Sequence, residues 1–214
     1  MKFETRAIRV GQDPESDYKS ITQPIYQTST FGWSDLDHIP PIDYTRCQNP
    51  NRQTLELVLA SLENAAHCTL FSSGMAAVAG VFSLLKAGDH LLIARDIYGG
   101  TFRLGEVVLP RQGIEVSFFD PAHPESLAGE IKANTLMLIF ESPTNPTLRV
   151  FDIAAICAVA KAKGVISVFD NTFASPALLN PLDHGADVVL HSTTKYISGH
   201  SDVVGGAVMT NNPA

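Results

Sequence analysis

The sequence has few cysteines and no long hydrophobic segment. Its three cysteines, Cys47, Cys68 and Cys157, are far apart and form no C-x-x-C pair, which argues against a zinc site or a disulfide framework. No apolar run approaches the roughly 20 residues of a membrane span, and the first residues lack the apolar core of a secretory signal. A few scattered thiols without such a signal are typical of a reducing compartment, so we expect a soluble cytoplasmic protein.

Basic residues are also in the minority, and none of them form a run. The 214 residues contain 15 Lys and Arg against 22 Asp and Glu, for a formal net charge of −7. Nucleic acid and membrane surfaces are therefore not expected partners. Hydrophobic residues make up 45% of the chain, which is enough for a sizeable core and excludes a disordered protein.

Several common motifs are missing as well. No G-x-G-x-x-G follows a predicted strand and no G-x-x-x-x-G-K-[ST] occurs, which disfavours dinucleotide binding and excludes a P-loop. The segment 199–203 (GHSDV) lacks the final glycine of G-x-S-x-G, so a hydrolase nucleophile elbow is unsupported. His67, His90, His123 and His184 are scattered and predict no metal site.

The pattern that is present alternates between strands and helices. Residues 1–50 are rich in Thr, Ser, Gln, Asp and Pro and resemble an arm, whereas residues 51–214 resemble a folded domain. The predicted strands are 69–71, 90–94, 115–119, 135–140, 165–169, 187–190 and 203–210, and the predicted helices are 54–66, 75–86, 100–109, 124–132 and 152–163. Strands that are apolar on both faces and alternate with helices predict an α/β fold, with a mostly parallel sheet between helices.

Polar residues follow several of these strands. Ser73 and Gly74, Glu141, Asp170, and the segment 192–195 all come directly after a predicted strand. In parallel sheets, ligands gather at the carboxyl ends of the strands, so we expect these residues to share one pocket.

Two of these groups favour an anion. The segment 72–75 (SSGM) places small residues between a strand and a helix start, where backbone N–H groups and the helix dipole attract phosphate. An ordinary strand–helix turn is the alternative. Ser192, Thr194 and Lys195 offer hydroxyls for a phosphate and an amine for a Schiff base, although most lysines are simply solvated.

The remaining candidates are ambiguous taken singly. Asp170 is suited to binding a metal, acting as a base, pairing with a cationic ring nitrogen or capping a turn. Tyr98, next to two glycines, is suited to stacking on a planar ligand or to lying in an ordinary loop. Asn145 lies between two prolines, which either present it as a rigid donor or simply stiffen the loop.

The order of the motifs is more specific than any one of them. SSGM, YGGT, ESPTNP, DNTFASP and HSTTKYISGHSDVVGG, preceded by YTRCQNP at 44–50, closely resemble the Cys/Met-metabolism family of pyridoxal-5′-phosphate (PLP) enzymes. That family includes cystathionine γ-synthases, cystathionine lyases, methionine γ-lyases and O-acetylhomoserine sulfhydrylases. The resemblance implies an aspartate-aminotransferase-like (fold type I) PLP domain and extends over almost the whole chain.

The resemblance also implies a role for each motif residue. Lys195 would hold PLP as a Schiff base and transfer protons, Asp170 would pair with the pyridine nitrogen, and Tyr98 would stack on the ring. Tyr44 and Arg46 would reach the phosphate of a neighbouring subunit, which implies a homodimer and usually a dimer of dimers. The remaining cofactor contacts implied are Gly74, Met75, Asn145, Thr172, Ser192 and Thr194.

The resemblance leaves the reaction and the extent of the chain open. Such enzymes act on cystathionine or a homoserine-derived amino acid by β- or γ-elimination or by γ-replacement. Gly100 stands where methionine γ-lyases have a reactive Cys, which disfavours that branch, whereas ESPTNPT and YTRCQNP favour the γ-synthase and γ-lyase branch. Family members continue into a smaller C-terminal domain that supplies an Arg for the substrate carboxylate, so we expect this chain to be a fragment or to have that domain on another chain. A catalytically silent cofactor-binding or assembly module is the alternative function.

Overall fold

The structure, a computed structural model, describes residues 1–12 and 19–212. Residues 13–18, within the predicted arm, and the last two residues of the sequence lie outside these ranges. The chain forms two compact units, Met1–Leu62 and Glu63–Ala214. The division of roles expected at residue 50, between an arm and a cofactor domain, stays a prediction.

Among its described residues, the first unit contains the helices α1 (Phe3–Arg9) and α2 (Pro50–Leu62), and residues 19–49 are mostly irregular. An antiparallel bridge between Thr30 and Tyr44 closes part of that segment. Helix α2 begins four residues before the predicted helix. Proline is favoured in the first turn of a helix, because its missing N–H has no helical partner there.

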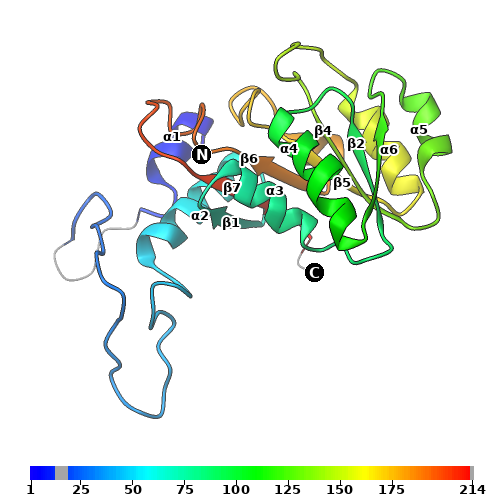
Figure 1. Cartoon of the computed structure of the whole chain (residues 1–214). Coiled ribbons are helices and arrows are strands. Elements are labelled where there is room, and N and C mark those ends of the chain that lie inside the picture. Colours follow the sequence, from blue (N-terminus) through cyan, green and yellow to red (C-terminus); the bar gives the residue numbers. More distant parts are fainter. Residues whose placement is uncertain (13–18, 213–214) are drawn as a thin grey trace. The chain divides into compact units, whose positions relative to one another are not determined.

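The second unit is built on a seven-stranded sheet in the order β1-β7-β6-β5-β4-β2-β3 (Figure 1). Strands β2 to β6 pair in parallel, while β7 is antiparallel to both β1 and β6. The strands are β1 (His67–Phe71), β2 (His90–Ala94), β3 (Glu115–Phe119), β4 (Thr135–Glu141), β5 (Ile166–Asp170), β6 (Val188–His191) and β7 (Gly206–Thr210). The predicted α/β fold with a mostly parallel sheet is confirmed.

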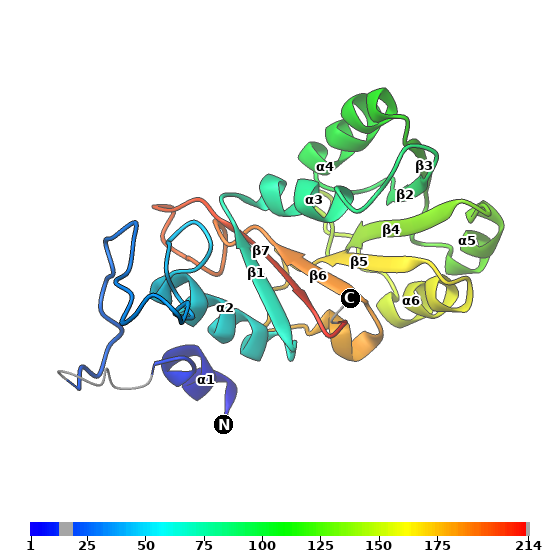
Figure 2. The same ribbon diagram turned by 90° about the horizontal axis from the view of Figure 1, so that it is seen from below.

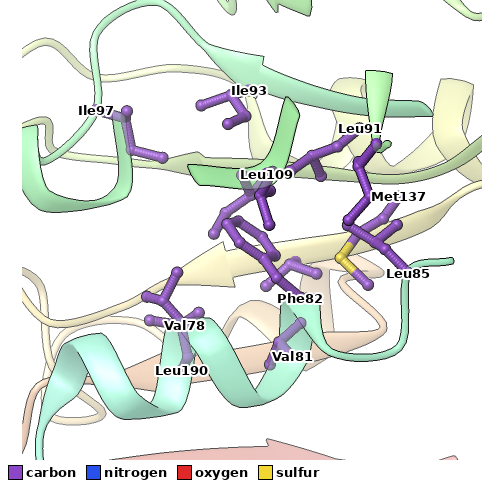
Figure 3. Close-up of a cluster of buried hydrophobic side chains, with 13 residues drawn as sticks. Val78, Val81, Phe82, Leu85, Leu91, Ile93, Ile97, Leu109, Met137 and Leu190 are labelled. Atoms are coloured by element: carbon purple, nitrogen blue, oxygen red, sulfur yellow. The ribbon is translucent and has the colours of Figure 1, made fainter. Parts of the chain in front are cut away.

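Helices cover both faces of this sheet, as Figure 2 shows. On one face, α3 (Gly74–Phe82) and the segment that starts with α4 (Gly99–Arg103) cover the strands. Figure 3 shows Val78 and Phe82 of α3 and Leu109 in one apolar cluster with Leu91, Met137 and Leu190 of the strands. On the other face, α5 (Pro124–Glu130) and α6 (Ile153–Ala162) cover a second apolar cluster. The two cores hold the strands, and thus the loops that follow them, in place.

Two predicted helices differ from the observed ones. Helix α3 ends at Phe82, because the chain then turns through residues 83–89 to enter β2. In this turn the backbone N–H of Gly88 donates to the carbonyl of Gly113. The predicted helix 100–109 is α-helical only to Arg103, and a π-helical turn (Leu104–Val108) and a 3-10 turn (Leu109–Gln112) follow. Pro110 has no N–H to continue an α-helical ladder, which accounts for the change. Helix α1, which lies in the predicted irregular arm, was not predicted.

The part of the chain that the structure describes contains no helix both long and apolar enough to cross a membrane.

A short 3-10 turn (Pro181–His184) links β5 and β6.

Candidate functional site

A cavity of about 950 Å³ opens at the carboxyl ends of β4, β5 and β6, next to the start of α3. In these strands Glu141 pairs in register with Asp170, and Asp170 with Leu190, so their ends coincide. The site residues predicted in the second unit all line this cavity: Gly74, Met75, Tyr98, Asn145, Asp170, Thr172, Ser192, Thr194 and Lys195. A volume of this size is in the usual range for a small-molecule site.

The turn before α3 forms one end of the cavity. Ser73 is the N-cap of α3, and its hydroxyl accepts a hydrogen bond from the backbone N–H of Ala76 at 3.0 Å. Gly74 lies against Ser192 on the neighbouring wall of the cavity, because a Cβ at position 74 would be 2.6 Å from Cβ of Ser192. Only glycine lets these two backbones approach so closely, and the positive end of the α3 dipole faces the same region.

The loop after β6 brings hydroxyls and an amine to the cavity. Thr194 is held by Gly205, whose backbone N–H donates to Oγ1 of Thr194 at 3.0 Å. The backbone N–H of Lys195 donates to the carbonyl of Ser192 at 3.2 Å, which makes a tight turn. The Lys195 side chain is exposed and lines the cavity, so its amine can reach a bound ligand.

Asp170 is the last residue of β5 and only 9% of it is exposed. The backbone N–H of Thr172 donates to Oδ1 of Asp170 at 2.9 Å, and Oγ1 of Thr172 accepts from the backbone N–H of Ser192 at 2.8 Å. Burial raises the pKa of Asp170, while the Thr172 hydrogen bonds and His191 lower it in part. A buried carboxylate of this kind is stabilised by a cationic group on a ligand.

Glu141 is a cavity residue for which the sequence predicted no role. It ends β4, is 5% exposed, and its Oε1 accepts from the backbone N–H of Asn145 at 2.6 Å. Burial first, and then the charge of Asp170, raise the pKa of Glu141 to about 8. Its place after an apolar strand was visible in the sequence, but its pairing with Asp170 depends on the order of the strands.

Tyr98 and Asn145 lie on two loops of the cavity that contact each other. Thr144, next to Asn145, donates from Oγ1 to Oδ2 of Asp96 at 3.1 Å, and Asp96 is two residues before Tyr98. Both Tyr98 and Asn145 are exposed and line the cavity. At Gly100, a Cβ would be 2.5 Å from Cε1 of Tyr98, so glycine there makes room for the tyrosine ring.

Tyr44 and Arg46 belong to the first unit. The guanidinium carbon of Arg46 lies 4.9 Å from the centre of the Tyr44 ring, a cation–π contact, and Arg46 is exposed. Their expected reach to a neighbouring subunit stays a prediction.

The comparison with known families is decisive. The profile of the Cys/Met metabolism PLP-dependent enzyme family matches residues 4–214. The chain belongs to this family. The resemblance seen in the motifs is thereby confirmed, and pyridoxal phosphate is the cofactor of the family.

Relatives of the Cys/Met metabolism family align with almost the whole chain. This chain is 49% identical over 210 residues to a probable cystathionine gamma-synthase of Herpetosiphon aurantiacus. That alignment covers 98% of this chain and 66% of the other protein. It is 48% identical over 214 residues to a putative cystathionine gamma-lyase 2 of Caenorhabditis elegans, covering 98% of this chain and 55% of the other. This chain therefore spans between about half and two thirds of the length of these relatives.

A solved structure shows the same fold. Cystathionine gamma-lyase from Lactobacillus plantarum complexed with L-serine is similar with a TM-score of 0.95 at 42% identity, covering 100% of this chain and 56% of that one. At this identity, the agreement supports the fold.

The residues around the cavity fit pyridoxal phosphate. The glycine turn at Gly74 leaves a space that a Cβ would fill, at the N-terminus of a helix where phosphate is favoured. The buried carboxylate of Asp170 matches a protonated ring nitrogen, and the amine of Lys195 matches the cofactor aldehyde. The described residues contain no group of three or more His, Cys, Asp or Glu suited to a metal ion.

Proposed function

We propose that this chain carries the cofactor site of a PLP-dependent enzyme that acts on cystathionine or a homoserine-derived amino acid. The reaction is abstraction of the α-proton followed by β- or γ-elimination or by γ-replacement at the carbon bearing sulfur or the leaving group. The observation that supports this most is one cavity lined by Lys195, Asp170 and the hydroxyls near Gly74. The names of the relatives, a gamma-synthase and gamma-lyases, support the substrate class.

Lys195 holds the cofactor through its Nζ and then moves the substrate proton. Lys195 lies on a tight turn after β6, where its backbone N–H donates to the carbonyl of Ser192. Its side chain is exposed. When bound, pyridoxal phosphate supplies an electron-accepting ring that makes the substrate α-proton acidic. Nζ of Lys195, which lines the cavity, would also be the base that takes that proton from the substrate.

Asp170 keeps the bound ring nitrogen protonated. Its carboxylate is buried and oriented by the Thr172 N–H, so a positive partner in the cavity would lower its raised pKa again. The pair is then stabilised by the attraction of opposite charges at a buried carboxylate. Tyr98 and Asn145 both line the cavity, where Tyr98 would stack on the ring and Asn145 would lie near the ring hydroxyl.

Gly74, Met75, Ser192 and Thr194 hold the phosphate. The hydroxyls of Ser192 and Thr194 line the same cavity as the start of α3, so they and the backbone N–H groups of that helix start would be the donors to a bound phosphate. Thr172 contributes by holding Asp170 and Ser192 at a set distance, through its backbone N–H and its hydroxyl.

The active form is a homo-oligomer, a dimer at least and a dimer of dimers by analogy with the family. Tyr44 and Arg46 support this assignment, because a stacked, exposed guanidinium is well suited to a phosphate presented by a second subunit. We place the protein in the cytoplasm, a proposal that the exposed Cys47 and the buried Cys157 support, because neither forms a disulfide.

The test is to add pyridoxal phosphate to the intact protein, reduce with borohydride and map the modified peptide. We expect a yellow protein whose reduced cofactor is on the peptide that contains Lys195, and no such product for Lys195→Ala. Turnover of cystathionine and of an O-acylhomoserine is then measured with both proteins. Turnover retained by Lys195→Ala would contradict the proposed function, and a labelled but inactive protein would favour the silent cofactor-binding module.

A further inference from the structure

A cluster of buried polar side chains lies behind the cavity, outside the residues that line it. Glu63, Asn171 and His191 are each at most 1% exposed. Oε1 of Glu63 is 2.5 Å from Nε2 of His191 and accepts a hydrogen bond from Nδ2 of Asn171 at 2.7 Å. One carboxylate oxygen thus connects two side chains that come from different strand ends.

The geometry of this cluster is strongly constrained. Nδ2 of Asn171 also donates to the carbonyl of Leu179 at 2.9 Å, and Oε2 of Glu63 accepts from Nδ2 of Asn180 at 3.3 Å. Among the described residues, Oδ1 of Asn171 has no hydrogen-bond partner. Turning the amide over would gain nothing, since it would place an oxygen against both the Glu63 carboxylate and the Leu179 carbonyl. The Asn171 amide therefore has one favourable orientation.

The two residues bound by Glu63 are the sequence neighbours of the cavity residues. Asn171 lies between Asp170 and Thr172, and His191 directly precedes Ser192. Adjacent residues of an extended segment point to opposite sides, so Asn171 and His191 face Glu63 while their neighbours face the cavity. The backbone N–H of Asn171 donates to the carbonyl of Leu190 at 3.0 Å, which joins the same two segments.

A buried carboxylate is costly unless it is fully hydrogen-bonded, and apolar residues of similar volume often give equal stability. Stability alone therefore does not account for a glutamate here. The hydrogen bonds do account for it, because they set the distance between the end of β5, which carries Asp170, and the end of β6, which carries Ser192.

We propose that Glu63 is a positioning residue of the cofactor site, whose carboxylate holds Asn171 and His191 together and so sets the spacing between Asp170 and Ser192. The proposal rests on the proposed function, since Asp170 and Ser192 would contact opposite ends of one rigid cofactor. An error of about 1 Å in that spacing would prevent both contacts from forming at once.

The test compares Glu63→Met with Glu63→Gln in the intact protein. Methionine keeps the volume and removes both acceptors, whereas the glutamine oxygen can still accept from His191 and Asn171. We measure the dissociation constant of pyridoxal phosphate and the wavelength of its visible band at a temperature well below the melting midpoint of each variant. We expect about tenfold or weaker binding and a shifted band for Glu63→Met, and binding within about threefold of the parent for Glu63→Gln.

Asp183→Asn is the matched control. Asp183 is an exposed carboxylate that accepts from Nδ2 of Asn64, the residue after Glu63, and its replacement should leave both measurements unchanged. If Glu63 has only a structural role, Glu63→Met will melt at a lower temperature but bind the cofactor like the parent protein, and the proposal is then wrong. A parent protein that binds no pyridoxal phosphate would instead contradict the proposed function.

A second set of variants covers the case in which Glu63→Met does not fold. His191→Gln keeps a donor near Nε2, and the double variant Glu63→Met with His191→Leu leaves an apolar pair in place of the hydrogen-bonded one. We expect His191→Gln to bind the cofactor nearly like the parent and the folded double variant to bind it about tenfold more weakly. Parent-like binding by the double variant would overturn the proposal.

Discussion

The backbone N–H of Asn145 donates to Oε1 of Glu141 over 2.6 Å, at the point where Glu141 lies beside Asp170 on the neighbouring strand. Two buried carboxyl groups therefore occupy adjacent strand ends at the base of the cavity. Burial is the main cause of the raised pKa of each, and the pKa of Glu141 rises to about 8. The cavity thus holds a proton at Glu141 that an exposed glutamate would release at neutral pH.

The stability of the cofactor-free protein should depend on this proton. Between the ordinary pKa of 4.5 and the folded value of about 8, the folded state holds a proton at Glu141 that the unfolded state has released. The free energy of unfolding due to Glu141 therefore falls as the pH rises through this window. Glu141→Gln should remove this fall, so its advantage over the parent protein should grow from pH 5 to pH 8 in urea unfolding experiments. An advantage that is the same at every pH would contradict the assignment.

Asp170→Asn should bind pyridoxal phosphate but lose most activity. The amide carries no charge to keep the ring nitrogen protonated, so we expect turnover to fall by about 100-fold or more. Steady-state turnover of cystathionine and the visible spectrum of the bound cofactor check this. Asp183→Asn, at an exposed carboxylate, is the control and should retain the parent rate.

Gly74→Ala should weaken both the fold and the phosphate site. The added Cβ would lie 2.6 Å from Cβ and 2.9 Å from Cα of Ser192, so a backbone segment has to move. We expect a loss of about 1–3 kcal/mol in the free energy of unfolding, together with weaker cofactor binding. In Gly129→Ala, within α5, the new Cβ meets nothing within 4 Å, and stability should be equal or slightly higher. Equal stability of the two variants would show that the approach of Gly74 to Ser192 is not a constraint.

Asp96→Ala should loosen the loop that carries Asn145. Asp96 accepts from the hydroxyls of Thr144 and Thr147, and Thr144 is fully buried. Removing the acceptor leaves a buried hydroxyl with one partner fewer, so we expect a loss of about 1–3 kcal/mol by urea unfolding. Asp120→Ala removes the half-exposed partner of Arg149 at 3.8 Å and an exposed acceptor for the backbone N–H of Ala122 at 3.0 Å, and should cost about 1 kcal/mol or less. A larger effect at Asp120 than at Asp96 would reverse this interpretation.

The cysteines should differ sharply in reactivity. Burial raises the pKa of the Cys157 thiol to about 11, and Cys157 is 2% exposed in the core beneath the sheet. Cys47 is exposed. At pH 8, iodoacetamide should alkylate Cys47 rapidly and Cys157 only after unfolding, because the thiolate is the reacting form. Mass spectrometry of the labelled peptides follows both sites, and early labelling of Cys157 in the folded protein would disagree with its burial.

The sequence by itself determined the elements that local pattern dictates and the residues that could do chemistry. The strands at 90–94 and 115–119 were predicted with their observed bounds, since the pattern that predicts them depends on neighbouring residues. The sequence also indicated one pocket for the polar residues that follow strands, because the carboxyl ends of parallel strands lie at one edge of the sheet. Of these residues Ser73, Gly74, Glu141, Asp170, Ser192, Thr194 and Lys195 line the cavity, whereas Met75 and Thr172 were expected there only from the family resemblance.

Only the tertiary structure decided which of those strand ends became neighbours. The order β1-β7-β6-β5-β4-β2-β3 places Glu141 beside Asp170 and puts the last strand between the first and the sixth, and no local pattern specifies this. It also brings Glu63 to His191 across 128 positions of the chain, and α3 ends early for a reason found in its connection to β2. Local sequence sets backbone preferences and chemical type, but burial, raised pKa values and shared hydrogen bonds depend on contacts between distant segments, which only the packed sheet creates.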